Sequence, residues 1–125
     1  MSAVRVLVVE DDPSVRGLLQ TLLTAEGYEV ATAADGLAAL QAASATLPAL
    51  VLLDLVMPDL GGARVIEQLR EDPALAAIPV IVVTGKEEAV PAMKDLLGDD
   101  NVVLKPFGVG ELLARVDDVT GGPGR

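Results

Sequence analysis

Hydrophobic residues gather in five short runs along the chain, and each run is followed by a segment in which they recur every three or four positions. Val, Leu and Ile dominate most of the runs, which cover residues 4–9, 28–32, 49–53, 79–83 and 101–104. Four runs are nearly continuous, as in strands buried on both faces of a parallel sheet, and 28–32 alternates weakly. The segments between them predict helices over residues 14–26, 37–46, 63–71, a short stretch from about 90, and 110–119.

Capping residues support several of these limits. Asp12 before Pro13 is a favourable N-cap and first-turn pair for the first helix. Asp35-Gly36 opens the second helix. Pro91 cannot occupy a helix interior, so the fourth helix is predicted to begin near Val90 and to be short.

Regular alternation of strands and helices predicts a mostly parallel sheet with helices on both faces. Right-handed crossovers leave few topologies, and at this size the common one is the flavodoxin-like strand order 2-1-3-4-5. The predicted fold is therefore a doubly wound α/β domain of five βα units. We expect it to cover residues 1–119, followed by a flexible Gly/Pro-rich tail over residues 120–125.

The composition excludes several kinds of chemistry. The 125 residues contain no cysteine and no histidine, which removes thiol nucleophiles, thiolate or imidazole zinc sites and histidine acid–base catalysis. Oxygen-ligand chemistry of the Mg²⁺ type remains. The net charge is −10 and the nine Lys and Arg are scattered, so we expect no direct nucleic-acid contact and no anionic membrane contact by this domain. No apolar run reaches the length of about 18 residues expected for a membrane span, and the first residues lack a signal-peptide layout.

Polar or charged residues follow four of the five predicted strands. Asp54 ends the run that begins at Ala49, and three acids, Glu10-Asp11-Asp12, follow the first run. Thr84 and Lys105 follow the fourth and fifth runs. In the predicted order the first and third strands are neighbours, so the acids lie close together and repel one another unless a cation compensates them.

This set predicts a phosphoryl-transfer site. Asp54 would be the nucleophile, a Mg²⁺ ion would bridge to the phosphoryl group, and Lys105 would neutralise the charge that develops on its oxygens. Taken singly, each residue has a structural explanation, since acids before a proline often only cap a helix. Four such residues at the ends of four strands favour a common site.

The motifs Glu10-Asp11-Asp12, Asp54 with Met57-Pro58 and Gly62, Thr84-Gly85 and Lys105-Pro106-Phe107 resemble, in order and spacing, the receiver domain of two-component response regulators. The similarity includes the chemotaxis response regulator and covers roughly residues 4–119. It implies a cytoplasmic signalling module that promotes only its own phosphorylation and dephosphorylation and acts on no separate substrate.

The resemblance assigns roles within the site. Asp54 would accept a phosphoryl group from the phosphohistidine of a histidine kinase. Asp11, Asp12 and Asp54 would be the acidic residues of the Mg²⁺ site, with Asp12 as a direct ligand, Asp11 acting partly through water, and the backbone carbonyl of Val56 as a further ligand.

Two more residues would respond to phosphorylation. Thr84 would swing toward the phosphoryl oxygens and Lys105 would pair with them, and a cis peptide bond is expected between Lys105 and Pro106. Val102 departs from the pattern, because receivers commonly carry an aromatic ring at this position.

The resemblance also implies partners. A histidine kinase or a phosphotransfer protein would dock on the first helix and the loop after the fifth strand; the candidate contact residues are Ser14, Val15, Leu18 and Phe107. Downstream, an effector protein or domain would receive the signal, and a homodimer would form through the face of the fourth helix, fifth strand and fifth helix.

Two alternatives remain at this point. A pseudo-receiver would bind proteins without phosphorylation, and Val102 slightly favours it. A Mg²⁺-dependent phosphohydrolase of the haloacid dehalogenase type would need a second aspartate two residues after the nucleophile, where this chain has Val56.

Overall fold

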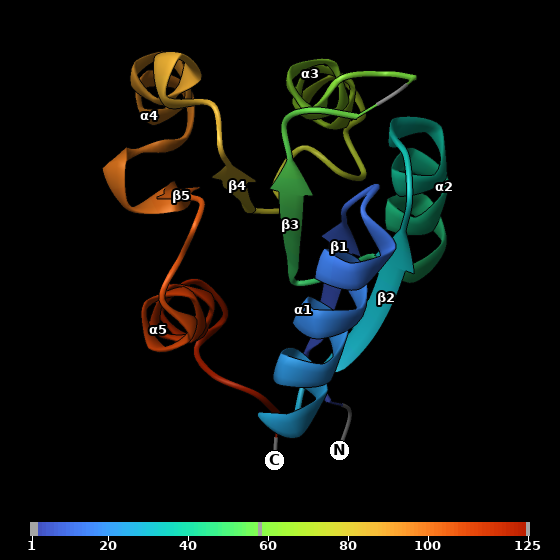
Figure 1. Cartoon of the computed structure of the whole chain (residues 1–125). Helices are drawn as coiled ribbons and strands as arrows, with labels where there is room; N and C mark the ends of the chain where they lie inside the picture. Colours follow the sequence, from blue (N-terminus) through green and yellow to red (C-terminus); the bar gives the residue numbers. More distant parts are fainter. Residues whose placement is uncertain (1–2, 58, 125) are drawn as a thin grey trace.

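The computed structural model describes residues 3–57 and 59–124. Pro58, part of the Met57-Pro58 motif, lies outside the described residues. Within the described residues, five parallel strands form one sheet in the order β2-β1-β3-β4-β5 (Figure 1). The strands are β1 Arg5–Val9, β2 Glu29–Ala33, β3 Leu50–Asp54, β4 Val80–Thr84 and β5 Val102–Leu104. The helices are α1 Pro13–Ala25, α2 Gly36–Thr46, α3 Gly62–Glu71, α4 Val90–Leu97 and α5 Val109–Thr120. The predicted flavodoxin-like α/β topology is confirmed.

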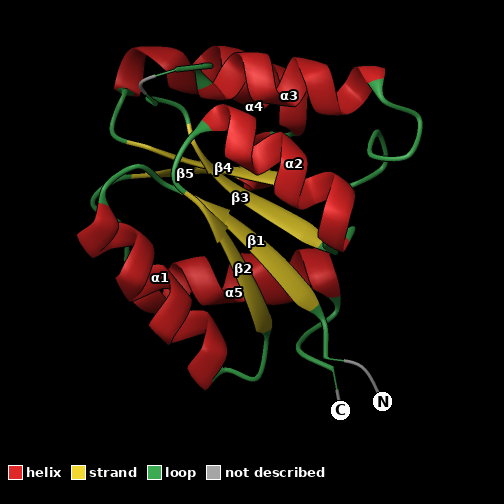
Figure 2. Cartoon of the chain, turned by 90° about the vertical axis from the view of Figure 1, so that its right-hand side faces the viewer, coloured by secondary structure: helices red, strands yellow, loops and turns green. Residues whose placement is uncertain are grey.

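Helices cover both faces of the sheet, with α1 and α5 on one side and α2, α3 and α4 on the other (Figure 2). Successive side chains of a strand point to opposite faces, so each strand supplies both cores. In β1, Leu7 and Val9 pack under α2 and α3, whereas Val6 and Val8 pack under α1 and α5. Every residue of β3 is buried, which explains its continuous apolar run.

Most element limits agree with the sequence-based prediction to within one or two residues. The Asp12 carboxylate caps α1, as predicted, and the Asp35 carboxylate caps α2. Strand β4 begins at Val80, one residue later than predicted, since Pro79 has no N–H and contributes only its carbonyl, which accepts from Val51. None of the described helices is long and apolar enough to span a bilayer.

Helix α4 is short, as Pro91 predicted, and it is loosely held. It spans eight residues, begins at Val90 after a 3₁₀ turn over Glu87–Ala89, and contains no buried residue. Only Met93 and Leu97 pack against the core, and both are partly buried. This helix therefore has the weakest apolar attachment of the five described.

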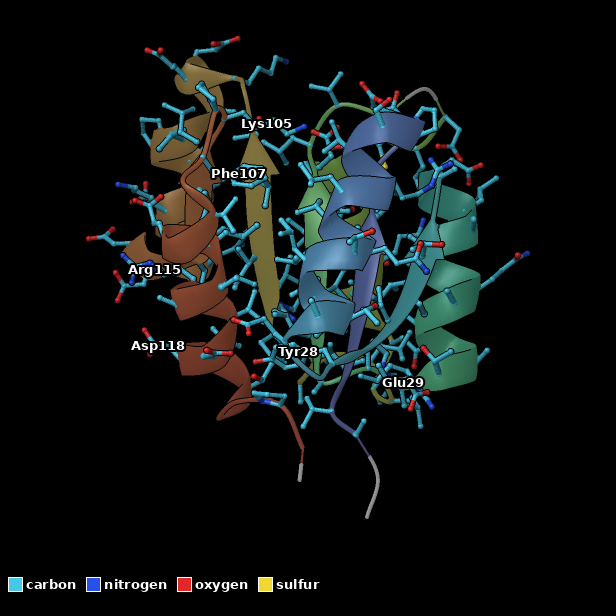
Figure 3. All side chains as sticks on the ribbon, turned by 60° about the horizontal axis from the view of Figure 1, so that its bottom comes forward. Tyr28, Glu29, Lys105, Phe107, Arg115 and Asp118 are labelled. Carbon is cyan, nitrogen blue, oxygen red and sulfur yellow. The ribbon has the colours of Figure 1, made fainter. Side chains whose placement is uncertain are left out.

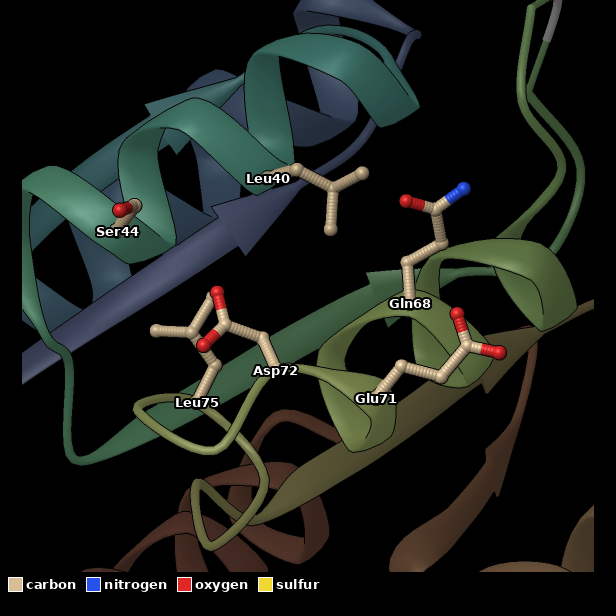
Figure 4. A pocket seen from close by; sticks show the side chains of 6 residues that line it. All are labelled: Leu40, Ser44, Gln68, Glu71, Asp72 and Leu75. Carbon is tan, nitrogen blue, oxygen red and sulfur yellow. The ribbon is translucent and has the colours of Figure 1, made fainter.

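Helix α2 is narrow because its inward side carries Ala39 and Ala43. The side of α2 that carries Leu40 and Ser44 faces α3 across a hollow of about 300 Å³ (Figure 4). The residues that line this hollow are Leu40, Ser44, Gln68, Glu71, Asp72 and Leu75. The two helices touch instead at the other end of α2, where the Cα of Gly36 lies so close to Val65 that an added Cβ would be 3.0 Å from it.

Tyr28 joins the start of β2 to the last turn of α5 (Figure 3). Its ring is only 3% exposed, and its hydroxyl donates to Asp117 and lies 2.9 Å from the Thr120 hydroxyl. Burial raises the pKa of Tyr28 to about 12, and the hydrogen bond to Asp117 adds to the effect. The end of α5 is thus fixed by a polar contact as well as by packing.

We expect Tyr28→Phe to lower the free energy of unfolding by about 1 kcal/mol, because it deletes a buried hydroxyl and its hydrogen bonds. The folded-state pKa lies above the ordinary value of 10.0, so the tyrosine's contribution is complete below pH 10 and is lost as the pH rises toward 12. Urea unfolding measured from pH 8 to pH 12 checks this. A Tyr28→Phe protein whose stability falls as steeply with pH as that of the unsubstituted chain would contradict the assignment.

Candidate functional site

The carboxyl ends of four strands meet at one edge of the sheet, and the predicted polar residues lie there. Strand register pairs Val9 of β1 with Leu53 of β3, so Glu10 comes next to Asp54. Thr84 ends β4, where it pairs with Leu104, and Lys105 follows directly. Open α/β sheets bind their ligands in this position.

Three carboxylates form the centre of the site. One carboxylate oxygen each from Glu10, Asp11 and Asp54 lies within 4.8 Å of the other two. Glu10 is 3% exposed and Asp54 is 8% exposed, whereas Asp11 is open to solvent. Carboxylate oxygens gathered in this way are the ligands that hard divalent cations prefer. The donor set therefore fits a metal ion.

Asp12 does not belong to this group. Its Oδ1 accepts from the backbone N–H of Ser14 at 2.8 Å and from that of Val15 at 3.4 Å, so it caps α1. The prediction of Asp12 as a direct metal ligand gains no support from this geometry. The structure gathers Glu10 with Asp11 and Asp54 instead.

Lys105 provides positive charge beside the cluster. Its Nζ lies 2.8 Å from Oε1 of Glu10 and 3.7 Å from Oδ2 of Asp54. Burial alone would lower the pKa of Lys105, but the hydrogen bond to Glu10 and the charge of Asp54 outweigh it and raise the pKa. The ammonium therefore stays charged. The peptide bond between Lys105 and Pro106 is cis, as expected.

Hydrogen bonds fix the two loops that carry or follow the carboxylates. Arg16 of α1 donates to the carbonyls of Glu10, at 2.9 Å, and Asp11, at 3.3 Å, and thus fixes the turn after β1. The backbone N–H of Val56 donates to Oδ1 of Asp54 at 3.2 Å. The sequence prediction did not include Arg16, and its spacing six residues after Glu10 on the first turn of a helix was the available signal.

Thr84 and Gly62 complete the surroundings of Asp54. The Thr84 side chain is fully buried and its Oγ1 accepts from the backbone N–H of Lys86 at 3.0 Å. A Cβ on Gly62 would lie 2.6 Å from the carbonyl oxygen of Asp54, so the start of α3 is in direct contact with the backbone of Asp54.

Comparison with known proteins agrees with this geometry. A model of the response regulator receiver domain matches residues 6–117. The DNA-binding response regulator MtrA of Mycolicibacterium smegmatis is 42% identical over 113 residues, which cover 90% of this chain and 48% of that protein. The probable transcriptional regulator ycf27 of Cyanophora paradoxa is also 42% identical over 113 residues, which cover 90% of this chain and 46% of that protein. The chain thus spans about half the length of these relatives.

Solved structures give the same result. The chemotaxis protein CheY4 of Vibrio cholerae has a TM-score of 0.84 at 28% identity, covering 94% of this chain and 99% of that one. The response regulator TrrA of Thermotoga maritima, in complex with Mg²⁺–BeF, has a TM-score of 0.83 at 32% identity, covering 93% and 98%.

We expect Lys105→Met to lower the free energy of unfolding by about 1–3 kcal/mol in the presence of EDTA, since it leaves the buried Glu10 carboxylate unpaired. The partial exposure of Lys105 keeps the loss below that of a fully buried pair. Urea unfolding measures it. Adding Mg²⁺ should restore part of the loss if the carboxylates bind the cation, and a variant as stable as the unsubstituted chain in EDTA would contradict the role of the ion pair.

Proposed function

The chain belongs to the response regulator receiver family, a family of signalling modules, and from that premise we propose that Asp54 is its phosphoryl acceptor. The acidic pocket of Glu10, Asp11 and Asp54 is typical of receivers that accept a phosphoryl group. One observation carries the proposal: Asp54 lies within this pocket, at the end of a fully buried strand, with the Lys105 ammonium 3.7 Å away. A buried carboxylate in such a place needs a chemical reason.

The physiological donor would be the phosphohistidine of a histidine kinase or a phosphotransfer protein. These 125 residues contain no histidine, so that phosphohistidine would lie outside them. An Asp54 oxygen attacks phosphorus, the bond from phosphorus to the imidazole nitrogen breaks, and that nitrogen takes up a proton. The product is an acyl phosphate on Asp54.

We assign a Mg²⁺ ion to Glu10, Asp11 and Asp54, with the carbonyl of Val56 as a further ligand. Bound there, the ion would neutralise the carboxylates and the phosphoryl oxygens. The cluster of carboxylate oxygens within 4.8 Å supports this assignment, and so does the Mg²⁺–BeF complex of TrrA. Asp12 remains outside the assignment, because its carboxylate caps α1.

Lys105 and Thr84 would respond to the new anion. The Lys105 ammonium is nearer to Glu10 than to Asp54, so it can turn from one carboxylate toward the phosphoryl oxygens without leaving the site. Within the described residues, the Thr84 hydroxyl accepts a hydrogen bond from the backbone N–H of Lys86 and donates none. The hydroxyl proton is available to a phosphoryl oxygen.

The surface for the phosphodonor protein would be an apolar hollow beside Lys105. It measures about 440 Å³ and is lined by Val15, Leu18, Lys105, Pro106, Phe107 and Val109. Leu18 is 49% exposed, and Figure 3 shows Phe107 and Lys105 on the segment that leads into α5. Three of the four predicted docking residues line the hollow, and Ser14 does not.

Further partners follow from the family. We propose that the domain acts in the cytoplasm and passes its signal to an effector protein or domain. The net charge of −10 argues against DNA binding by this domain itself. Relatives of about twice its length are named as DNA-binding. A homodimer through α4, β5 and α5 would cover Leu104, which is 40% exposed on β5.

We expect acetyl phosphate and Mg²⁺ to add one phosphoryl group to the chain, and Asp54→Asn or EDTA to abolish the addition. Intact-protein mass spectrometry measures this, and beryllofluoride binding provides a second test. If neither phosphoryl addition nor Mg²⁺ binding occurs, the chain is instead a pseudo-receiver that binds proteins without phosphorylation.

We expect Leu18→Ala to lower kcat/KM for transfer from a phosphorylated kinase or phosphotransfer domain by about tenfold, the loss of roughly 1.4 kcal/mol of apolar burial. The matched control is Leu37→Ala, since Leu37 is 59% exposed but lies on α2 across the sheet. Equal loss in both variants would contradict docking at the hollow.

A further inference from the structure

The loop that follows Asp54 is fastened to the N-terminus of α2 by Asp59. Oδ1 of Asp59 accepts from the backbone N–H of Gly36 at 2.9 Å, and Oδ2 accepts from that of Leu37 at 3.1 Å. These are the first two amides of α2, which have no partner inside the helix. The helix's own cap, Asp35, serves only the next amide, that of Ala38. The two carboxylates therefore have separate tasks at one helix end.

Close backbone packing surrounds this attachment. A Cβ on Gly36 would lie 2.7 Å from Cβ of Leu60 and 2.9 Å from its carbonyl oxygen. At the other end of the same loop, Gly62 leaves equally little space against the carbonyl of Asp54. Asp59 and Leu60 are thus held against the start of α2, and Gly62 is held against the backbone of Asp54 and Leu55.

The Asp59 carboxylate is held in its charged form. Hydrogen bonds from the amides of Gly36 and Leu60 lower its pKa, so the carboxylate stays ionised at neutral pH. An anion at the positive end of α2 is favourable in addition to the hydrogen bonds themselves. Because Asp59 is open to solvent, its effect is local to the loop rather than a large share of global stability.

We propose that Asp59 is a positioning residue for the cation and phosphoryl site: by fastening the loop to α2, it fixes the place of Val56 beside Asp54. The backbone N–H of Val56 already donates to Asp54, and its carbonyl is the assigned cation ligand. Asp59 itself touches no reacting atom. The inference rests on the proposed function insofar as the site binds a cation.

Coupling between two sites is reciprocal. If the attachment at Asp59 favours cation binding, cation binding must favour the attachment by the same free energy. The amides of Gly36 and Leu37, which Asp59 accepts from, should then exchange their hydrogens more slowly when Mg²⁺ is bound. A carboxylate that only capped α2 would give no such response to a cation at Asp54.

The test compares Asp59→Asn with the matched control Asp35→Asn. Both substitutions neutralise one carboxylate at the same end of α2, but only Asp59 belongs to the loop after Asp54. Titration calorimetry with Mg²⁺ alone should give a roughly tenfold higher Kd for Asp59→Asn, the low end of the effects found for residues that orient metal ligands. Asp35→Asn should bind Mg²⁺ with the Kd of the unsubstituted chain.

Equal Kd values for Asp59→Asn and the unsubstituted chain, or an equal rise in both variants, would overturn the inference and leave the proposed function intact. If the unsubstituted chain binds no Mg²⁺, both fail together. Hydrogen exchange of Gly36 and Leu37 in the unsubstituted chain needs no variant: slower exchange on adding Mg²⁺ supports the coupling, and unchanged exchange overturns it.

Discussion

The mutual repulsion of three carboxylates at the edge of the sheet is the constraint on which the site depends. Glu10 and Asp54 are almost entirely buried, Asp11 lies beside them, and one ammonium, that of Lys105, faces the group. Two unit charges 4 Å apart interact by roughly 4 kcal/mol at an effective dielectric constant of 20, and among the described residues only Lys105 forms ion pairs with these three carboxylates, so the cluster remains short of positive charge. The same deficit that costs folding free energy makes the cluster suited to hold a divalent ion.

The fold supports this unfavourable group with an apolar sheet. The three central strands, β1, β3 and β4, are buried along almost their whole length. Two separate cores cover the two faces of the sheet. Parallel strands place their carboxyl ends at one edge, so residues far apart in the chain meet without any long loop. Glu10 and Lys105, for example, are 95 positions apart and form an ion pair of 2.8 Å.

The sequence predicted the strand order and the residues at each strand end because continuous apolar runs and the polar residues after them can be recognised locally. It assigned Asp12 rather than Glu10 to the metal site, since three consecutive acids do not reveal which side chains face Asp54. The pair Asp12-Pro13 did signal a helix cap, and the structure shows the Asp12 carboxylate turned toward α1. Asp59 was beyond prediction: its contact with Gly36 spans 23 positions and depends on the course of a loop.

The absence of an aromatic ring at Val102 does not disconnect Asp54 from the rest of the domain. The Thr84 oxygen accepts from the backbone N–H of Lys86, which directly precedes the 3₁₀ turn over Glu87–Ala89 and then α4. In the proposed switch, turning the Thr84 hydroxyl toward a phosphoryl oxygen would strain or break this bond, and α4, with no buried residue, would offer little resistance to a change at its start. A bond from side chain to backbone two residues away would then connect the phosphoryl site to α4, and no ring would have to move.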